Sequence, residues 1–348
     1  MNSRLAAALR AFRDGPAELS TASPEPQREN GGDPLDEAIA TLRETPIAEI
    51  QARGFHFQSR DYYSPLNDLE FLEQNRDLWQ RRAMPRGIEW DLDAQFAFVR
   101  RLAPAILELA DVPQEMPPGP PSYHWRNDFW TGGDALIHYG LLREAKPRRV
   151  VEVGCGWSSL LMARALARNE DEGAPPATVD QVEPYARTEL LRALPEDWRL
   201  HETMLQRAPL ELFEQLGDGD ICFYDGSHVA RAGSDVNWFF FEVVPRLAPG
   251  VIVHVHDIFW PFDYPETWIF DRGQTWNEQY VLQAFLMLNR EFEVIVSNCA
   301  IFDAYEGEME DLFGTFPVVR SGCSLWMRRK PAAGRDEDRG GGIGVAAG

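Results

Sequence analysis

The chain has 348 residues, 44% of them hydrophobic, which is enough for a core and for one large domain or a domain with additions. Its 34 Lys and Arg against 55 Asp and Glu give a formal net charge of −21, which argues against nucleic acid or an anionic membrane as a partner, because both need clustered basic residues. The four cysteines show no zinc-type spacing, and no apolar run is long enough to cross a membrane. We therefore expect reduced thiols and a cytoplasmic protein.

The two ends of the chain are predicted to be tails. Residues 1–33 contain a short amphipathic stretch followed by a polar segment rich in Pro and Gly. Residues 331–348 are of low complexity. Neither segment can bury enough apolar surface to order itself, so we expect both to be disordered.

Residues 34–128 are predicted to form an N-terminal helical and aromatic cap on the domain that follows. The apolar spacing indicates one helix over 35–50 and another over about 91–110. Aromatic residues are dense between positions 55 and 128. We expect most of them in the core, with an acceptor pocket as the alternative.

Residues 129–330 are predicted to form one α/β domain, because strands and helices alternate regularly along them. Seven strands are expected, over 149–153, 178–182, 198–202, 221–224, 251–255, 292–297 and 324–328. Helices are expected over 133–144, 158–168, 209–215, 234–247 and 276–289. This order indicates an α/β fold with a Rossmann-like, doubly wound, mostly parallel seven-stranded sheet. Ligands of such sheets bind outside the carboxyl ends of the strands.

A glycine turn follows the first strand and is typical of a nucleotide site. The stretch RVVEVGCGWSSLL, residues 149–161, indicates a buried strand, a tight turn and a helix. Gly154 and Gly156 are expected to allow backbone angles and a close approach that a Cβ would prevent, below the free N–H groups of the helix. Ser159 stands where the dinucleotide fingerprint has its third glycine. A dinucleotide fold and a purely structural turn remain alternatives.

Two polar residues after the second and third strands are candidates for nucleoside binding. Glu183 lies about 27 residues beyond Gly156, where a carboxylate can accept both hydroxyls of a ribose. NAD also carries this ribose, so Glu183 by itself does not exclude a dehydrogenase. Gln206 is expected to reach the adenine edge.

Acids and histidines end the fourth and fifth strands. Asp225, His256 and Asp257 should converge above the sheet, where they could hold Mg²⁺ or another divalent cation as a Lewis acid. His228 is a candidate general base, because an unperturbed histidine pKa of about 6.5 allows it to accept a proton at neutral pH. The alternative is that the acids only hydrogen-bond their loops.

These motifs resemble bacterial class I S-adenosylmethionine (SAM) methyltransferases. The resemblance is carried by EVGCGWSS, VEP, DGSH and LAPGVIVHVHDIF in that order, and it covers about residues 62–328. The chain is also distantly similar to metal-assisted sugar O-methyltransferases, which have DxxH after the fourth strand and an acidic pair after the fifth. By that similarity Asp225 and His228 match as metal ligand and base, and Asp257 matches the second acid, whereas His256 replaces the first.

The sequence thus predicts a SAM-dependent methyltransferase that methylates a hydroxyl of a small acceptor, such as a sugar or polyol, by in-line transfer. The residues expected to bind SAM are Glu152, Gly154, Gly156, Ser158, Ser159, Glu183, Gln206 and Asp225. The expected catalytic residues are His228, Asp225 and Asp257, and the expected metal ligands are Asp225, His256 and Asp257. Trp260, Phe262, Tyr264 and Trp268 are expected to wall the acceptor pocket.

Two other functions remain as alternatives. One is a non-catalytic SAM-binding or scaffold protein, and the other is an NAD-dependent dehydrogenase. The expected partner is a small-molecule acceptor, and whether the chain forms a homo-oligomer stays open.

Overall fold

The computed structural model describes residues 34–80, 86–317 and 322–330. The two predicted tails, residues 1–33 and 331–348, lie outside the described residues. The chain divides into two compact units, residues 1–65 and 66–348, so the predicted cap is divided between them. Among the described residues, no helix has the length and apolar character that crossing a membrane requires.

In the first unit the structure describes residues 34–65, which contain two short helices, α2 (Pro34–Glu44) and α3 (Ile47–Gln51). The sequence predicted a single helix over 35–50. The break lies at Pro46, which has no N–H to donate and disfavours a helical conformation in the residue before it.

The second unit is built on a seven-stranded sheet in the order β3-β2-β1-β4-β5-β7-β6. Its strands are β1 (Arg149–Val153), β2 (Thr178–Val182), β3 (Arg199–His201), β4 (Ile221–Tyr224), β5 (Ile252–Val255), β6 (Phe292–Ser297) and β7 (Leu325–Arg329). β7 is antiparallel to both of its neighbours, and the pairs among the other strands are parallel. The predicted mostly parallel, seven-stranded architecture is confirmed.

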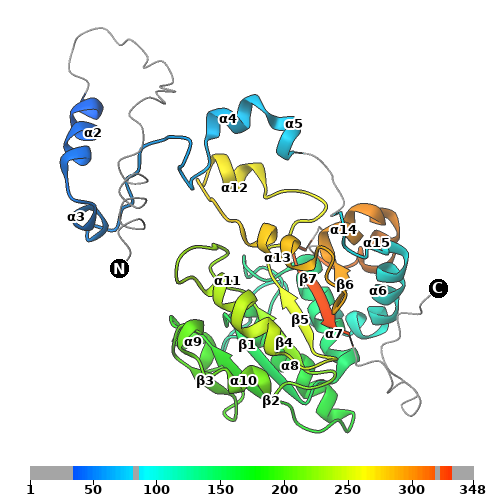
Figure 1. The fold of residues 1–348 in the computed structure, drawn as a ribbon. Coiled ribbons are helices and arrows are strands. Elements are labelled where there is room, and N and C mark those ends of the chain that lie inside the picture. Colours follow the sequence, from blue (N-terminus) through cyan, green and yellow to red (C-terminus); the bar gives the residue numbers. More distant parts are fainter. Residues whose placement is uncertain (1–33, 81–85, 318–321, 331–348) are drawn as a thin grey trace, which may run out of the picture. The chain divides into compact units, whose positions relative to one another are not determined.

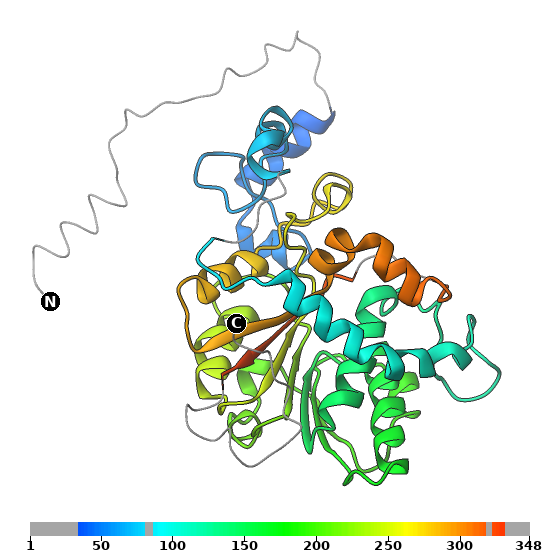
Figure 2. The ribbon, with the colours of Figure 1, turned by 90° about the vertical axis from the view of Figure 1, so that its right-hand side faces the viewer.

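Helices cover both faces of this sheet (Figures 1 and 2). One face packs against α6 (Leu92–Ile106), α7 (Gly132–Ala145), α8 (Trp157–Asp171), α14 (Asn298–Ala304) and α15 (Glu306–Phe313). The other packs against α10 (Glu211–Glu214), α11 (Asp235–Trp238) and α13 (Glu278–Leu286). Successive strand residues alternate between the two cores, as Phe223 and Tyr224 do, because side chains of a strand point to opposite faces.

Shorter elements complete the second unit. They are α4 (Leu69–Gln74), α5 (Arg76–Trp79), α9 (Thr188–Leu191) and α12 (Glu266–Phe270), with 3₁₀ turns η1 (Leu107–Asp111) and η2 (Leu205–Arg207). The predicted helix over 234–247 is a composite: α11 continues into a π turn, η3 (Phe239–Val243), and a 3₁₀ turn, η4 (Val244–Arg246). Pro245 lies in the last turn and cannot donate the N–H of a regular α-helix. The sequence did not predict α12, α14 or α15.

The expectation that most aromatic residues between 55 and 128 belong to a core is wrong. Phe98, Tyr123 and Trp125 are buried in the first core cluster. Phe55, Tyr62, Tyr63 and Phe71 are exposed. The segment before α6 has only short helices, which are too few to enclose large rings.

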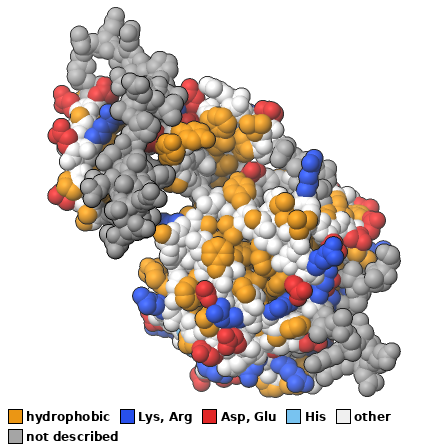
Figure 3. Space-filling model, in the orientation of Figure 1, with side chains coloured by type: hydrophobic (Ala, Val, Ile, Leu, Met, Phe, Trp, Pro, Cys, Tyr) orange, Lys and Arg blue, Asp and Glu red, His pale blue; other side chains and the backbone are white. Residues whose placement is uncertain are grey.

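The surface carries mixed charges. On the face drawn in Figure 3, Lys and Arg side chains are interspersed with Asp and Glu, with apolar side chains between them. Among the described residues of this face, the basic side chains therefore form no continuous stretch.

Candidate functional site

The ends of four neighbouring strands bring the predicted site residues to one edge of the sheet. The N–H of Gly154, after β1, donates to the carbonyl of Val182 at the end of β2 (3.1 Å). The N–H of Asp225, after β4, donates to the carbonyl of Val153 (2.9 Å). His256, after β5, is joined in the same way to the end of β4. Residues that follow β2, β1, β4 and β5 therefore lie side by side.

The two glycines of the turn have different requirements. Gly154 has φ +84°, and a Cβ there would lie 2.1 Å from the carbonyl oxygen of Asp225. Gly156 has φ −175°, an extended backbone that any residue adopts, and a Cβ there would meet no atom within 4 Å. The expectation of glycine-only backbone geometry thus holds at Gly154 and is wrong at Gly156, where the backbone faces open space.

A buried hydrogen-bond network holds the turn to α8. Glu152 accepts hydrogen bonds from Ser158 Oγ (2.8 Å), Ser159 Oγ (2.7 Å) and Gln181 Nε2 (2.6 Å). Ser159 Oγ also accepts the N–H of Gly156 (3.0 Å). Burial raises the pKa of Glu152 to about 7, although these hydrogen bonds act to lower it. The structure therefore places Glu152, Ser158 and Ser159 in the interior beneath the turn.

The two candidates for nucleoside binding flank this turn. Glu183 is half-buried, and its Oε1 accepts the N–H of Tyr185 (2.7 Å). Gln206, on η2, donates to the carbonyl of Gly233 (2.7 Å) in the loop after β4. Burial raises the pKa of the Cys155 thiol to about 12, and the charges of Glu152 and Glu183 contribute. Cys155 is therefore a neutral thiol at physiological pH.

His228 is enclosed by three carboxylates. Its Nδ1 lies 2.8 Å from Glu278 Oε2, and its Nε2 lies 3.3 Å from Asp225 Oδ1 and 3.4 Å from Asp257 Oδ2. The backbone of His228 is left-handed (φ +59°), and its carbonyl accepts N–H groups from Asn277 and Glu278. Sequence reasoning missed Glu278, whose only signal was an acid at the start of a predicted helix.

These carboxylates set the charge of the cluster. Burial lowers the pKa of His228, but the hydrogen bonds to Asp225 and Glu278 outweigh it and raise that pKa well above its ordinary value. Burial raises the pKa of Asp225, but attraction by His256 and His228 outweighs it and lowers that pKa. In this arrangement His228 carries a proton at neutral pH, so the ordinary pKa assumed from the sequence does not apply.

A second group of ligand-type side chains lies beside this cluster. Asp134 on α7, His256 after β5 and Cys323 before β7 each offer one ligand atom, and these atoms lie within 4.8 Å of one another. Within the described parts of the chain, these three form the group of His, Cys, Asp or Glu side chains whose ligand atoms are close enough together to hold one metal ion. It shares only His256 with the predicted metal ligands, because the ring of His228 lies between Asp225 and Asp257.

The donors of this group do not match Mg²⁺. Magnesium prefers near-octahedral oxygen ligands, whereas thiol and imidazole groups select softer ions. Sequence reasoning missed Asp134 and treated Cys323 only as a reduced thiol. Their signal was weak, since neither residue lies near a second ligand in the sequence.

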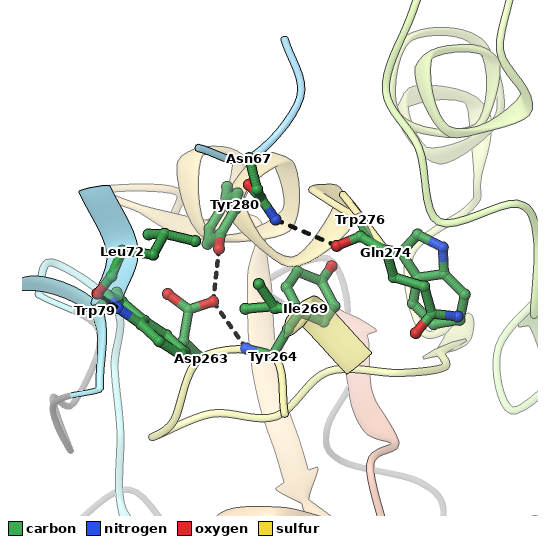
Figure 4. A pocket seen from close by; sticks show the side chains of 9 residues that line it. All are labelled: Asn67, Leu72, Trp79, Asp263, Tyr264, Ile269, Gln274, Trp276 and Tyr280. Atoms are coloured by element: carbon green, nitrogen blue, oxygen red, sulfur yellow. Dashed lines mark hydrogen bonds between the residues drawn. The ribbon is translucent and has the colours of Figure 1, made fainter. Parts of the chain in front are cut away.

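A small hollow lies next to Trp276 (Figure 4). It is lined by Asn67, Leu72, Trp79, Asp263, Tyr264, Ile269, Gln274, Trp276 and Tyr280, and its free volume is about 40 Å³. Asp263 Oδ1 accepts the hydroxyl of Tyr280 (2.5 Å) and the N–H of Tyr264 (2.8 Å). The ring of Trp276 also packs on His228, with 4.3 Å between ring centroids. Trp276 is therefore shared by the hollow and the cluster.

The predicted pocket walls are only partly in this hollow. Tyr264 lines it, and Trp268 packs edge-on against Trp276. Trp260 is buried against Trp90, and Phe262 is exposed. Neither of these two lines the hollow.

The central part of this chain matches a known family. Residues 151–258 match the family model described as "Methyltransferase domain". The match covers less than half of the chain. The resemblance to methyltransferases that the sequence indicated is confirmed over these residues. The matched segment contains Gly154, Glu183, Asp225 and His256, whereas Asp134, Glu278 and Cys323 belong to flanking segments.

Solved structures resemble the chain only distantly. The MycE methyltransferase from the mycinamycin biosynthetic pathway, in complex with Mg, SAH and mycinamycin VI, is 14% identical with a TM-score of 0.34, and the match covers 61% of this chain and 52% of that chain. The CmcI-N160 apo-structure is 16% identical with a TM-score of 0.34, covering 88% and 98%. The cmcI-D160 structure with Mg and SAM is 17% identical with a TM-score of 0.29, covering 77% and 99%. The chain thus matches about half the length of MycE. A search of the curated proteins finds no match.

Proposed function

We propose that this chain is a SAM-dependent methyltransferase that methylates a hydroxyl oxygen of a small acceptor, such as a sugar or polyol. The observation that carries the proposal is the placement of Glu183, the Gly154 turn and Asp225 side by side at the carboxyl ends of β2, β1 and β4. In open α/β sheets this edge is where ligands bind.

The turn suits a nucleoside without a pyrophosphate. Gly156 faces open space, so a ligand can approach its backbone closely. Ser159, at the third position of the dinucleotide pattern, is held in the interior by Glu152. A carboxylate at Glu183 suits the two hydroxyls of a ribose. These features favour SAM over NAD.

Methyl transfer then needs an acceptor oxygen in line with the methyl group and a residue that takes its proton. The oxygen forms a bond to the methyl carbon while the bond from that carbon to sulfur breaks, which leaves S-adenosylhomocysteine (SAH) and a methyl ether. His228 Nε2 takes the hydroxyl proton, and Asp225 and Asp257 flank that nitrogen. Because the carboxylates favour the protonated ring, His228 has to release its proton before it accepts one. Most of the rate gain comes from positioning and proton transfer.

The hollow beside Trp276 suits part of a polyhydroxylated acceptor. Its free volume of about 40 Å³ has room for about three water molecules, so it holds one small polar group of an acceptor. Aromatic rings and the carboxylate of Asp263 line it. Apolar faces with a few polar groups are the usual means of orienting such a ligand.

Calorimetric titration of the full chain tests the cofactor. SAM and SAH should bind and NADH should not. Glu183→Ala should weaken SAM binding about tenfold or more, because a charge-assisted hydrogen bond contributes about 1.5 to 3 kcal/mol. Glu189→Ala, an exposed acid on α9, is the control and should bind SAM as the wild type does. Binding of NADH without SAM would instead identify a dehydrogenase.

Transfer of a labelled methyl group from SAM to sugars, polyols, phenols and carboxylic acids tests the reaction. A hydroxylated acceptor should become labelled, and His228→Asn should lower the rate about 100-fold or more while SAM still binds. His201→Asn, a partly exposed histidine paired with Asp180, is the control. A wild-type rate in His228→Asn at saturating SAM and acceptor contradicts the assignment of the base. SAM binding without transfer to any acceptor favours a scaffold role.

A further inference from the structure

Three side chains from distant parts of the sequence form a compact set of metal donors beside the methyltransferase site. Asp134 lies in the first turn of α7, His256 follows β5, and Cys323 lies just before β7. Their ligand atoms lie within 4.8 Å of one another. Four-coordinate zinc, with bonds of 2.0 to 2.3 Å, holds its ligand atoms about 3.5 Å apart. Small side-chain rotations therefore suffice to close the set around an ion.

We propose that Asp134, His256 and Cys323 bind one divalent transition-metal ion of the Zn²⁺ class. This site adjoins the proposed methyl-transfer site, since Asp257 contacts both His228 and Cys323. The proposed methyl transfer itself includes no metal step.

The donor types select this class of ion. A thiolate with an imidazole and a carboxylate is a ligand set of Zn²⁺ and related ions, whereas Mg²⁺ and Ca²⁺ are held by oxygen ligands. Asp257 Oδ1 lies 3.0 Å from Cys323 Sγ and 3.6 Å from His256 Nε2. Asp257 is therefore near two of the three donors and is the candidate for a fourth ligand.

Each donor is held by a further contact, as metal ligands commonly are. Asp134 accepts hydrogen bonds from Asn298 Nδ2 (2.9 Å) and from the N–H of Cys323 (3.0 Å). His256 Nδ1 lies 3.3 Å from Ser324 Oγ, which leaves Nε2 to face Asp257. These contacts orient the donors before an ion arrives.

The backbone before Cys323 fits closely around Asp134. A Cβ at Gly322 would lie 2.3 Å from Asp134 Oδ1 and 2.8 Å from Asn298 Nδ2. Glycine at this position thus allows the chain to bring Cys323 against Asp134.

The charges of the set also favour a cation. Asp134 and Asp257 are buried, and among the described residues the ion pairs of Asp257 are with His228 and His256. Buried carboxylates are costly without a compensating positive charge. Metal binding breaks the S–H bond, forms the bond from sulfur to the metal and releases the proton to solvent.

Metal titration of the full chain, after removal of bound metal with a chelator, tests the site without SAM or acceptor. One equivalent of Co²⁺ should bind, with the near-ultraviolet charge-transfer absorption of a thiolate ligand, and Zn²⁺ should displace it. Protons should be released on binding. Mg²⁺ should neither produce nor displace this signal.

Variants locate the ion. Cys323→Ser should remove the charge-transfer band, and Asp134→Asn should weaken binding about tenfold or more. Cys155→Ser and Cys299→Ala are matched controls and should keep the band. Circular dichroism shows whether Cys323→Ser folds. If it does not, the ion is still located at Asp134 and Cys323 when the band persists in both controls and weakens in Asp134→Asn.

Three results would overturn the proposal. They are no binding of Co²⁺ or Zn²⁺, binding without a thiolate band, and binding that Asp225→Asn abolishes but Asp134→Asn leaves unchanged. None of these depends on methyl transfer, so failure here leaves the proposed reaction standing, and a chain that binds metal but transfers no methyl group leaves the metal site standing.

Discussion

Gly154 and Gly156 are two residues apart and should respond differently to the same substitution. Gly154→Ala places a Cβ 2.1 Å from the carbonyl oxygen of Asp225 at φ +84°, so it should lower the free energy of unfolding by about 2 kcal/mol or more. Gly156→Ala meets no atom within 4 Å and should keep wild-type stability, but it should weaken SAM binding if SAM lies against this backbone. Denaturant unfolding and calorimetry measure the two effects. Equal losses of stability in Gly154→Ala and Gly156→Ala would contradict the conclusion that only position 154 requires glycine.

The buried carboxyl of Glu152 should make stability depend on pH. Its pKa is raised from 4.5 to about 7 in the folded protein, so between these pH values the folded state binds more protons than the unfolded state. The free energy of unfolding should therefore fall as pH rises through this window, by up to about 3 kcal/mol from this group. Glu152→Gln should lack this contribution, and the measurement is urea unfolding at pH 5 and pH 8. Glu170→Gln, an exposed acid on α8, should keep the wild-type pH dependence. A pH dependence unchanged in Glu152→Gln would assign it to other groups.

Arg143 connects three elements on one side of the sheet. From α7 it donates to Glu108 of η1, to Asn169 of α8 and to Glu172 at the end of α8. Its side chain is 5% exposed, whereas those of Glu108 and Glu172 are 27% and 39% exposed. Breaking a fully buried pair costs about 3 to 5 kcal/mol, and partial exposure of the acids reduces this cost.

We therefore expect Arg143→Met to lower the free energy of unfolding by about 1 to 3 kcal/mol in denaturant titration. Arg126→Met is the control, because the side chains of its ion pair with Glu115 are 64% and 68% exposed. Exposed pairs contribute about 0 to 1 kcal/mol. Similar losses in both variants would mean that the Arg143 network is no stronger than a surface pair.

Strand β7 has a role that its sequence alone does not reveal. It lies antiparallel between β5 and β6, with His254 opposite Trp326 and Val255 opposite Leu325. This register brings Ser324 Oγ to 2.9 Å from His254 Nε2 and places Cys323 against Asp257. One antiparallel insertion thus carries a late segment of the chain into the site.

At the scale of the whole molecule, residues 66–348 should fold without the preceding unit. They contain the complete sheet and both core clusters. A chain of these residues should unfold cooperatively, with a midpoint within about 4 °C of the full chain, which for this size corresponds to about 1 kcal/mol. Thermal unfolding followed by circular dichroism measures it. A non-cooperative or much lower transition would show that the second unit needs the first.

The amino-acid sequence by itself determined the strands, the glycine turn and the edge of the sheet at which a ligand is expected to bind. The predicted strands over 178–182, 221–224 and 292–297 match β2, β4 and β6 residue for residue, because apolar runs bounded by turn residues are local signals. The requirement for glycine at position 154 is also local in part, since it follows from the turn after β1. The placement of Glu183, Asp225 and His256 at one edge follows from the parallel order of the strands.

Only the tertiary structure decided which side chains meet and what charge they carry. Glu278, Asp134 and Cys323 come from segments far from the motifs. Packing of α7 and α13 against the sheet, and pairing of β7 within it, bring them to His228 and His256. The shifted pKa values of His228 and Glu152 result from burial and from these distant partners. Sequence patterns report the periodicity of neighbouring residues, whereas desolvation and long-range pairing exist only once the chain has folded.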